Sequence, residues 1–370
     1  MKSRLWFIVL LSAFATIGPA RSGHELPVYP SYYPHEIEIR TVGPDAAGRL
    51  LPQAEIQAYL GNEPRFPGGA PDVPGVVQPL GSLVTVRVNP QSAYAKDQAS
   101  ACTAVRTVAR TIHASGSDVV LHPYPVTPLH GDYLHHVDLA AAAKAHLLSA
   151  SQAEPAIPTL KVKAPDMPAS QSGWDVEIRR VALSDLMASA MTVVDGWLLP
   201  PAVRSGWYQA WLVLRDALDV AARERLSADV QRLLVNDVRD QVERINLERA
   251  VVTALVADCR QAVIGYTLRR EYFNTEFSAG IENIGFDALS GLNSAIFIRT
   301  VKLKDFPWNG WLHLGIDAEP RSAWNPITGF SDSFGHLLWS AVADPALLPQ
   351  PYDDAWMANR ISAIEAAPSK

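Results

Sequence analysis

The segment that most constrains the fold spans residues 82–125 and has the pattern strand, helix, strand. The Val-rich run "SLVTVRVNP" (82–90) is typical of a strand, and "SDVVLHPYP" (117–125) predicts a second strand that enters a proline loop. Between them, "KDQASACTAVRTVARTIHAS" (96–115) repeats apolar residues every three or four positions, which predicts an amphipathic helix. A helical crossover returns the chain in the same direction, so we expect the two strands to pair in parallel within an α/β fold.

The loops after these two strands are a first candidate for a ligand site. Ligands of open parallel sheets gather at the carboxyl ends of the strands. The segments "NPQSAYAKD" (89–97) and "HPYPVTPLHGD" (122–132) leave those ends, and Tyr124 lies in the second of them. We therefore expect a cleft lined by these loops, with Tyr124 among its ligand-binding or partner-binding residues.

The second half of the chain predicts helices followed by a hairpin. Residues 200–259 repeat apolar side chains every three or four positions, which favours amphipathic helices. In "AIFIRTVKLKDFPWNGWLHLGI" (295–316), two alternating runs flank Asn309 and Gly310, a pair that suits a tight hairpin turn. The second half is therefore expected to be α+β, helix-rich with a β-hairpin over residues 295–316.

Composition and a proline-rich stretch indicate two lobes. With 370 residues, 48% of them hydrophobic and 19% charged, the chain is long enough for a large core and favours two lobes over one. Residues 151–172 are rich in Pro, Ser and Ala and are expected to form a linker or a surface excursion. The expected lobes are residues 23–150, an α/β lobe that begins with an extended arm, and residues 173–370, the helix-rich lobe.

Residues 1–22 have the pattern of a secretory signal peptide. Lys2 and Arg4 precede an apolar run, and small residues follow it, which places cleavage near Ala20 or Ser22. The apolar run is shorter than the roughly 20 residues that a bilayer span needs, and no later stretch is apolar for that long. We expect a soluble, exported, periplasmic protein whose mature chain has no transmembrane segment.

The charge balance argues against two classes of partner. The formal net charge is −6, and the sequence has no dense block of Lys and Arg. Nucleic acid and anionic membrane surfaces both attract basic patches, so neither is expected as a partner.

Two groups of aromatic residues are candidates for binding a partner. The arm "GHELPVYPSYYP" carries Tyr29, Tyr32 and Tyr33 among prolines that impose an extended conformation, and we expect it to dock on an envelope protein. Trp308 and Trp311 lie at the expected hairpin tip, where they either stack on a solute or partner or cover the end of the core.

Cys102 and Cys259 are the two cysteines of the chain. Both lie on predicted helices next to apolar residues. In an exported protein an even pair suits a structural disulfide, and two buried free thiols suit the same pattern. Neither cysteine has a neighbouring base or a second cysteine at redox spacing, so a catalytic thiol is disfavoured.

The segment "LHPYPVTPLHGDYLHHVD" (121–138) concentrates residues that bind metals. His122, His130, Asp132 and His135 are the candidate ligands of one zinc or copper ion. The spacing matches no established zinc pattern, and the alternative is that Asp132 caps the helix that follows while the histidines form hydrogen bonds in the loop.

Two further patterns resemble parts of hydrolase sites. "GFSDSFGH" (329–336) contains Ser333, Asp332 and His336, but it lacks the glycines of a nucleophile elbow and is typical of a capped helix. Glu271 and Asp287 lie among carboxylates that form either an acid–base pair or ion pairs with nearby arginines. The surrounding stretch, 265–312, is dense in aromatic, Asn, Gly and Arg residues, which favours a recognition surface over an irregular lobe by a small margin.

These observations leave two hypotheses of different class. The favoured one is an exported periplasmic binding or accessory protein without cofactor, either a solute receptor or a non-catalytic subunit of an envelope complex. The alternative is a metal-dependent exported hydrolase that uses the segment from His122 to Asp138, where a bound ion would activate water.

Overall fold

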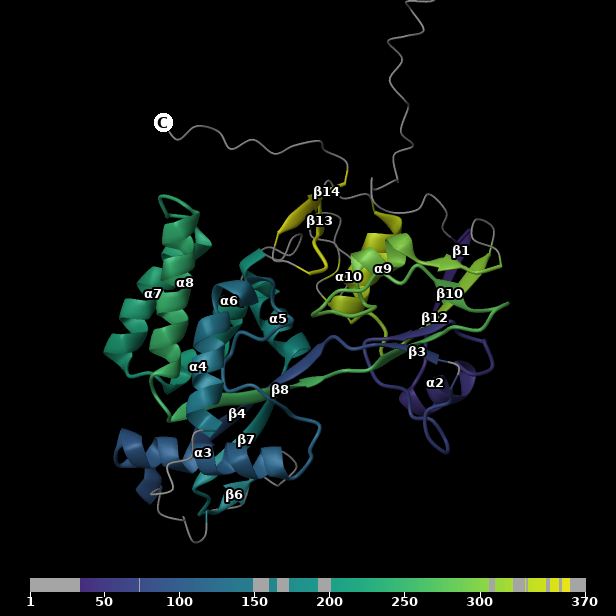
Figure 1. Cartoon of the computed structure of the whole chain (residues 1–370). Coiled ribbons are helices and arrows are strands. Elements are labelled where there is room, and N and C mark those ends of the chain that lie inside the picture. The colour runs from purple at the N-terminus through teal and green to yellow at the C-terminus, as the bar shows by residue number, and fades with distance from the viewer. Residues whose placement is uncertain are drawn as a thin grey trace, which may run out of the picture.

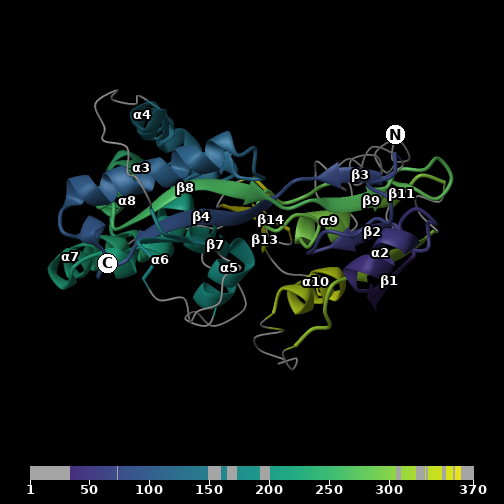
Figure 2. The same ribbon diagram turned by 90° about the horizontal axis from the view of Figure 1, so that it is seen from below.

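The computed structural model describes residues 34–72, 74–148, 160–164, 173–191, 201–305, 310–321, 330, 332–343, 347–352 and 355–359. These residues form two lobes, each built around a five-stranded sheet (Figure 1). Seen from below, the lobes lie side by side, and neighbouring segments of the chain connect them (Figure 2). Within the described residues, no helix combines the length and apolarity that crossing a membrane requires. The predicted two-lobed α/β architecture is confirmed.

Lobe 2 is the lobe whose sheet has the strand order β5-β8-β4-β7-β6. Its strands are β4 (Leu80–Val88), β5 (Val120–Leu121), β6 (Val162–Lys163), β7 (Val176–Ala182) and β8 (Gln261–Leu268). Its helices are α3 (Gln98–Ala114), α4 (Val137–Leu148), α5 (Leu183–Met191), α6 (Gly206–Leu214), α7 (Val220–Leu234) and α8 (Gln241–Val256). Short 3₁₀ helices are η1 (Ala93–Ala95), η2 (Gly131–His135), η3 (Pro201–Arg204) and η4 (Arg215–Ala217).

The central strand β4 is covered on both faces, which explains its nearly continuous apolar sequence. Successive side chains of a strand point to opposite faces. Val84 and Val86 belong to the core beneath α3, whereas Leu83 shares a second core with Trp207 of α6. In Figure 1 α3 lies on one side of this sheet and α6 on the other.

Lobe 1 is the lobe whose sheet has the strand order β1-β12-β2-β9-β3. Its strands are β1 (Glu36–Thr41), β2 (Ala58–Leu60), β3 (Pro74–Val77), β9 (Glu271–Asn274) and β12 (Trp311–Ile316). Helix α2 (Pro44–Leu50) covers one face, and α9 (Ala295–Thr300) and α10 (Ser333–Val342) cover the other. Two small antiparallel pairs complete the fold, namely β10 (Ile281–Glu282) with β11 (Lys302–Leu303), and β13 (Leu347–Pro349) with β14 (Trp356–Ala358).

Within its described residues, the chain crosses between the lobes twice. It leaves lobe 1 between β3 and β4 and returns between β8 and β9. The two crossings touch, because the Arg269 backbone N–H donates to the Pro79 carbonyl oxygen over 2.9 Å. Lobe 2 is therefore one continuous segment, residues 80–268, whereas lobe 1 combines residues from before and after that segment.

This topology corrects the predicted division of the chain at residues 151–172. Strand β4, from the N-terminal side of that stretch, pairs along its length with β7 and β8 from the C-terminal side. The stretch thus does not separate the two sheets, and its described part, 160–164, contributes β6 to lobe 2. Pairing between distant strands leaves no local signal in composition, which is why a proline-rich loop resembled a boundary.

The predicted strand–helix–strand unit is present as β4, α3 and β5, with one correction. The two strands run in the same direction but do not pair, because β8 lies between them and is antiparallel to both. The sheet is mixed rather than open and parallel.

The prediction of a β-hairpin over residues 295–316 is wrong. Residues 295–300 form α9, whose N-cap Ser294 accepts a hydrogen bond from the Phe297 backbone N–H. Strand β12 pairs with β1 and β2, and within the described residues β11 pairs with β10 instead. A short helix buried on nearly every side has the same apolar content as a strand, so six residues did not distinguish the two. The expected turn, 306–309, lies outside the described residues.

A disulfide joins Cys102 and Cys259, which resolves the alternatives left open by the sequence. Cys102 lies in α3, and Cys259 lies between α8 and β8. The bond therefore fastens the helix that covers one face of the lobe 2 sheet to the strand next to β4.

Candidate functional site

The predicted metal ligands lie close in sequence but do not converge on one point. The His122 Nε2–H donates to the Val126 carbonyl oxygen over 2.8 Å. His130 accepts from the Thr127 backbone N–H at Nδ1 and donates to Gln209 Oε1 at Nε2, both over 2.9 Å. Among the described residues, no three His, Cys, Asp or Glu side chains are arranged to hold a metal ion. The predicted zinc or copper site is therefore not formed.

Asp132 does act as a cap, but for a different helix from the expected one. Its two carboxylate oxygens accept from the backbone N–H groups of Gly206 and Trp207, over 2.9 and 3.0 Å, at the start of α6. Asp132 is buried. A carboxylate at this position satisfies two N–H groups that the helix leaves without an internal partner and favours the positive end of its dipole.

His135 and Tyr124 also belong to the packing of lobe 2. His135 Nδ1 lies 3.8 Å from Glu248 Oε2 on α8. The Tyr124 hydroxyl donates to His136 Nδ1 over 2.9 Å, and Tyr124 is 2% exposed. Tyr124 is thus not available to a solute or partner, which corrects its assignment as a binding residue. The histidine segment thus packs against α6 and α8 within lobe 2.

The loops after β4 and β5, where a cleft was expected, do not line the cavity between the lobes. Strand β4 begins at the lobe crossing, so its carboxyl end at Val88 points away from lobe 1. The loop after β5 is the histidine segment, and α6 packs against it. Residues 89–97 and 122–132 therefore lie away from the junction of the lobes.

The remaining predicted binding residues do not line a described cavity. Trp311 begins β12 and is 64% exposed, so its role in binding a partner stays a prediction. Tyr29, Tyr32, Tyr33 and Trp308 lie outside the described residues, as does the predicted signal peptide.

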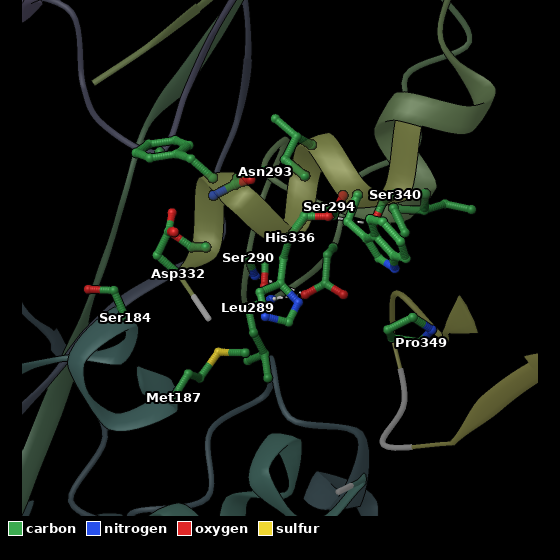
Figure 3. A pocket seen from close by; sticks show the side chains of 18 of the residues that line it. Ser184, Met187, Leu289, Ser290, Asn293, Ser294, Asp332, His336, Ser340 and Pro349 are labelled. Carbon is green, nitrogen blue, oxygen red and sulfur yellow. Dashed lines mark hydrogen bonds between the residues drawn. The ribbon is translucent and has the colours of Figure 1, made fainter. Parts of the chain in front are cut away.

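A cavity of about 760 Å³ lies where the two lobes meet. Lobe 2 contributes Ser184 and Met187 from α5, and Arg204 from η3. Lobe 1 contributes the segment 287–296 and α10, while β13 and β14 form a further wall. In Figure 3, Met187 and Ser184 lie opposite His336 and Asn293, with Ser290 and Leu289 between them.

Helix α10 is positioned by its cap and by a close approach to β2. Asp332 accepts from the Gly335 backbone N–H over 2.9 Å, which confirms the capped helix predicted for "GFSDSFGH". Gly61 follows β2 with φ +83°, and a Cβ atom there would lie 2.8 Å from the Phe334 ring. A side chain at position 61 would thus displace the first turn of α10 from the cavity wall.

The turn that carries Leu289 and Ser290 into the cavity is held by a buried ion pair. Asp287 Oδ2 lies 2.6 Å from Arg204 Nη2, and both side chains are buried. The other oxygen of Asp287 accepts from the backbone N–H groups of Leu289 and Ser290 over 2.9 and 2.8 Å. Because Arg204 comes from η3 of lobe 2, this pair also ties the two lobes together.

A second ion pair lies beneath the same turn. Glu271, fully buried at the start of β9, lies 2.7 Å from Arg269 Nη2 at the crossing. Glu271 also accepts from the Leu292 backbone N–H over 2.6 Å. Burial raises the pKa of Glu271, and Arg269 and the backbone donors oppose that shift. Glu271 and Asp287 therefore form ion pairs with arginines, as one of the two sequence interpretations held, rather than an acid–base pair.

Two buried polar atoms on the cavity wall lack a hydrogen-bond partner among the described residues. They are His336 Nε2 on α10 and Asn293 Oδ1 in the turn before α9. Burial lowers the pKa of His336, so its imidazole is neutral at ordinary pH. Buried polar atoms without partners are rare and costly, and these two are available to a molecule in the cavity.

The wall shows no nucleophile paired with a base within its described part. The Ser340 hydroxyl donates to the backbone oxygen of His336 rather than to the imidazole. Hydrolysis by a serine requires the hydroxyl to contact the base.

The sequence indicated only part of this site. It singled out His336 and Asp332, for a different reason, and it favoured 265–312 as a recognition surface, which includes Leu289, Ser290 and Asn293. The contribution of α5 was missed, because nothing in "ALSDLM" distinguishes a cavity wall from an ordinary surface helix.

No family model and no curated protein matches this sequence. Among solved structures, NikA from Brucella suis in complex with Fe(III)-EDTA is 15% identical with a TM-score of 0.34, over 67% of this chain and 58% of that one. The ABC transporter-associated periplasmic binding protein DppA from Helicobacter pylori, in complex with the peptide STSA, is 13% identical with a TM-score of 0.38, over 72% and 56%. The periplasmic murein tripeptide binding protein MppA, in an unliganded open form, is 12% identical with a TM-score of 0.37, over 70% and 55%. The chain spans little more than half the length of these structures, and likeness at this level transfers neither a fold nor a ligand.

Proposed function

We propose that this chain is an exported receptor that binds a small solute between its two lobes. The observation that carries the proposal is the cavity of about 760 Å³ at the junction of the lobes, whose wall contains two buried polar atoms that no described residue contacts by a hydrogen bond. That volume lies within the range of about 300–1,000 Å³ that is typical of small-molecule sites.

The connection between the lobes supports a receptor that opens and closes. Two neighbouring crossings, at residues 77–80 and 268–271, are the covalent links between the lobes in the described chain. A change of backbone angles at a few such residues moves whole lobes as rigid bodies. Solute bound to both walls would favour the closed arrangement, since closure removes its apolar surface from water.

Export to the periplasm is part of the proposal. The signal pattern in residues 1–22 and the disulfide between Cys102 and Cys259 support it, because disulfides persist in oxidising compartments. A receptor there would deliver its solute to a membrane partner.

The test is native mass spectrometry of the untagged protein purified from its own cells. We expect one non-covalent adduct per chain, and we expect Ser290→Trp, which fills the cavity, to abolish it. The matched control is Ser115→Trp at the exposed end of α3, which should keep the adduct. An adduct that survives Ser290→Trp would place the solute elsewhere and contradict the proposal, and co-purification of an envelope protein without any adduct would favour a non-catalytic subunit.

A further inference from the structure

We infer that the solute is uncharged and rich in hydroxyl groups, with an apolar face, which is the chemistry of a carbohydrate. The inference rests on the proposed function, because it names the class of molecule that the same cavity would take. It is carried by the pairing of Arg204 and Arg269 on the wall, by the two neutral polar atoms that have no partner among the described residues, and by hydroxyl and aromatic side chains contributed from both lobes.

The buried Arg204 and the half-buried Arg269 on the wall are already neutralised. Arg204 faces Asp287, and Arg269 faces Glu271, in contacts of 2.6 and 2.7 Å. Each guanidinium also donates to a backbone oxygen, Arg204 to Gln350 over 2.9 Å and Arg269 to Ser290 over 3.1 Å. A carboxylate or phosphate brought into the cavity would compete for donors that are in use, and a buried charge without a partner is strongly unfavourable.

The unpartnered atoms on the wall are neutral and suit hydroxyl groups. Asn293 Oδ1 accepts hydrogen bonds only, so its partner must carry an O–H or N–H donor. His336 Nε2 belongs to an imidazole that burial keeps uncharged, so it either donates or accepts one hydrogen bond. A solute hydroxyl both donates and accepts, and adjacent hydroxyls can satisfy the two atoms together.

Other wall residues extend this pattern. Ser184 from lobe 2 and Ser290 from lobe 1 both line the cavity with hydroxyl-bearing side chains (Figure 3). The aromatic side chains of Phe334 and Trp356 also line it. Sugars present C–H groups on their faces and hydroxyls along their edges, so rings and hydroxyls on one wall match both surfaces of such a molecule.

Exposed charged residues of the cavity wall do not change the class, and the half-buried Asp332 is occupied as the cap of α10. Asp185, Asp317 and Glu319 are exposed, and so is Arg321. Asp317 already accepts from the Tyr59 hydroxyl over 3.3 Å and from Asn62 Nδ2 over 3.0 Å. Charges in contact with water attract a ligand weakly, because water and salt screen them. A cationic solute is the alternative that these residues raise, and the experiment includes it.

The experiment compares four classes of probe by calorimetric titration of the intact, disulfide-bonded protein. The probes are three uncharged saccharides (cellobiose, maltose and raffinose), the zwitterion trialanine, the cation spermidine and the anion citrate. We expect at least one saccharide to bind and the three charged probes not to bind. The saccharide affinity should change by less than about twofold between low and high salt, because no charge pair is involved.

Two variants assign the binding to the cavity wall. Asn293→Ala should weaken the saccharide about tenfold, the effect of removing one hydrogen bond to a buried group. The matched control is Asn246→Ala on the exposed face of α8, which should leave the affinity unchanged.

The outcomes separate this inference from the proposed function. If trialanine, spermidine or citrate binds, loses affinity on Asn293→Ala, and the saccharides do not bind, the receptor function stands and the solute class is wrong. If no probe binds and the purified protein carries no adduct, both are overturned.

Discussion

At the scale of single residues, Asp132 shows how a residue typical of metal sites serves packing instead. It is buried and accepts from two backbone N–H groups of α6, which is far from it in sequence. The sequence predicted a capping carboxylate at this position but assigned it to the adjacent helix. Only the tertiary fold brings Gly206 and Trp207 to it.

Asp132→Ala should lower the free energy of unfolding by about 1–3 kcal/mol, because two buried N–H groups lose their acceptor. Asp97→Ala, which removes the exposed cap of α3, is the control and should cost about 1 kcal/mol. Urea denaturation measures both. If both variants lost the same free energy of unfolding, burial of the Asp132 contacts would add nothing to their contribution to stability.

Buried histidines of the same segment predict a dependence of stability on pH. Burial lowers the pKa of His136 from 6.5 to about 4, against the opposing effect of Asp132, and burial also lowers the pKa values of His122 and His130. The folded state thus holds these imidazoles neutral, whereas the unfolded state takes up protons below its ordinary pKa. Their stabilising contribution is present above about pH 6.5 and is lost as the pH falls towards 4.

For His136 this loss is on the order of 3 kcal/mol at its largest. Urea midpoints measured from about pH 7.5 down to about pH 4, a range that roughly spans the two pKa values, should fall steadily as the pH is lowered. His136→Phe should flatten the curve, since that side chain takes up no proton. If His136→Phe left the pH dependence of the urea midpoint unchanged, other groups would be its cause.

At the scale of elements, the disulfide is the strongest single constraint on lobe 2. It closes a loop between residues 157 positions apart, from α3 to the start of β8. A cross-link over a loop of this length restricts the unfolded chain considerably.

Replacing both cysteines, as Cys102→Ser with Cys259→Ser, should lower the free energy of unfolding by about 3–5 kcal/mol. Adding dithiothreitol to the unaltered protein should give the same urea midpoint as the double variant. The double variant itself should not respond to the reductant, and a response would show that the reductant acts elsewhere.

The elements that the sequence predicted correctly are those with a long local signal. The helix at 96–115 has a clear apolar stripe and an Asp97 cap, and it is present as α3. Residues 295–300 were predicted as a hairpin strand but form a helix. The helix was missed because Ile296, Phe297 and Ile298 are all buried, so the sequence shows no helical periodicity of apolar and polar residues there. The position of β8 between β4 and β5 was missed because pairing partners far apart leave no local pattern.

At the scale of the whole molecule, one lobe is continuous in sequence and the other is not. Residues 80–268 supply one sheet, the disulfide and two of the hydrophobic cores, apart from Leu289. Lobe 1 has its strands on both sides of that segment. Sequence composition did not reveal this insertion, because the two crossings are each only a few residues long.

Residues 78–269 expressed alone should therefore fold. We expect cooperative urea unfolding and a dispersed amide spectrum for this fragment, since its cores are contained within it. Residues 34–77 expressed alone should remain unfolded, because β1 and β2 lack β12 and β9. A fragment 78–269 that unfolds without cooperativity would show that lobe 2 depends on lobe 1 for its stability.

The edge strand β1 has β12 as its ladder partner, and those strands are residues 36–41 and 311–316. While the chain folds, β1 remains unpaired until β12 is available, whereas lobe 2 can assemble from its own continuous segment. A product that stops before residue 311 would keep lobe 2 but expose open strand edges, which invite pairing with other chains. Closure of lobe 1 thus requires β12, so truncated and full-length products differ in whether the edge of β1 is paired.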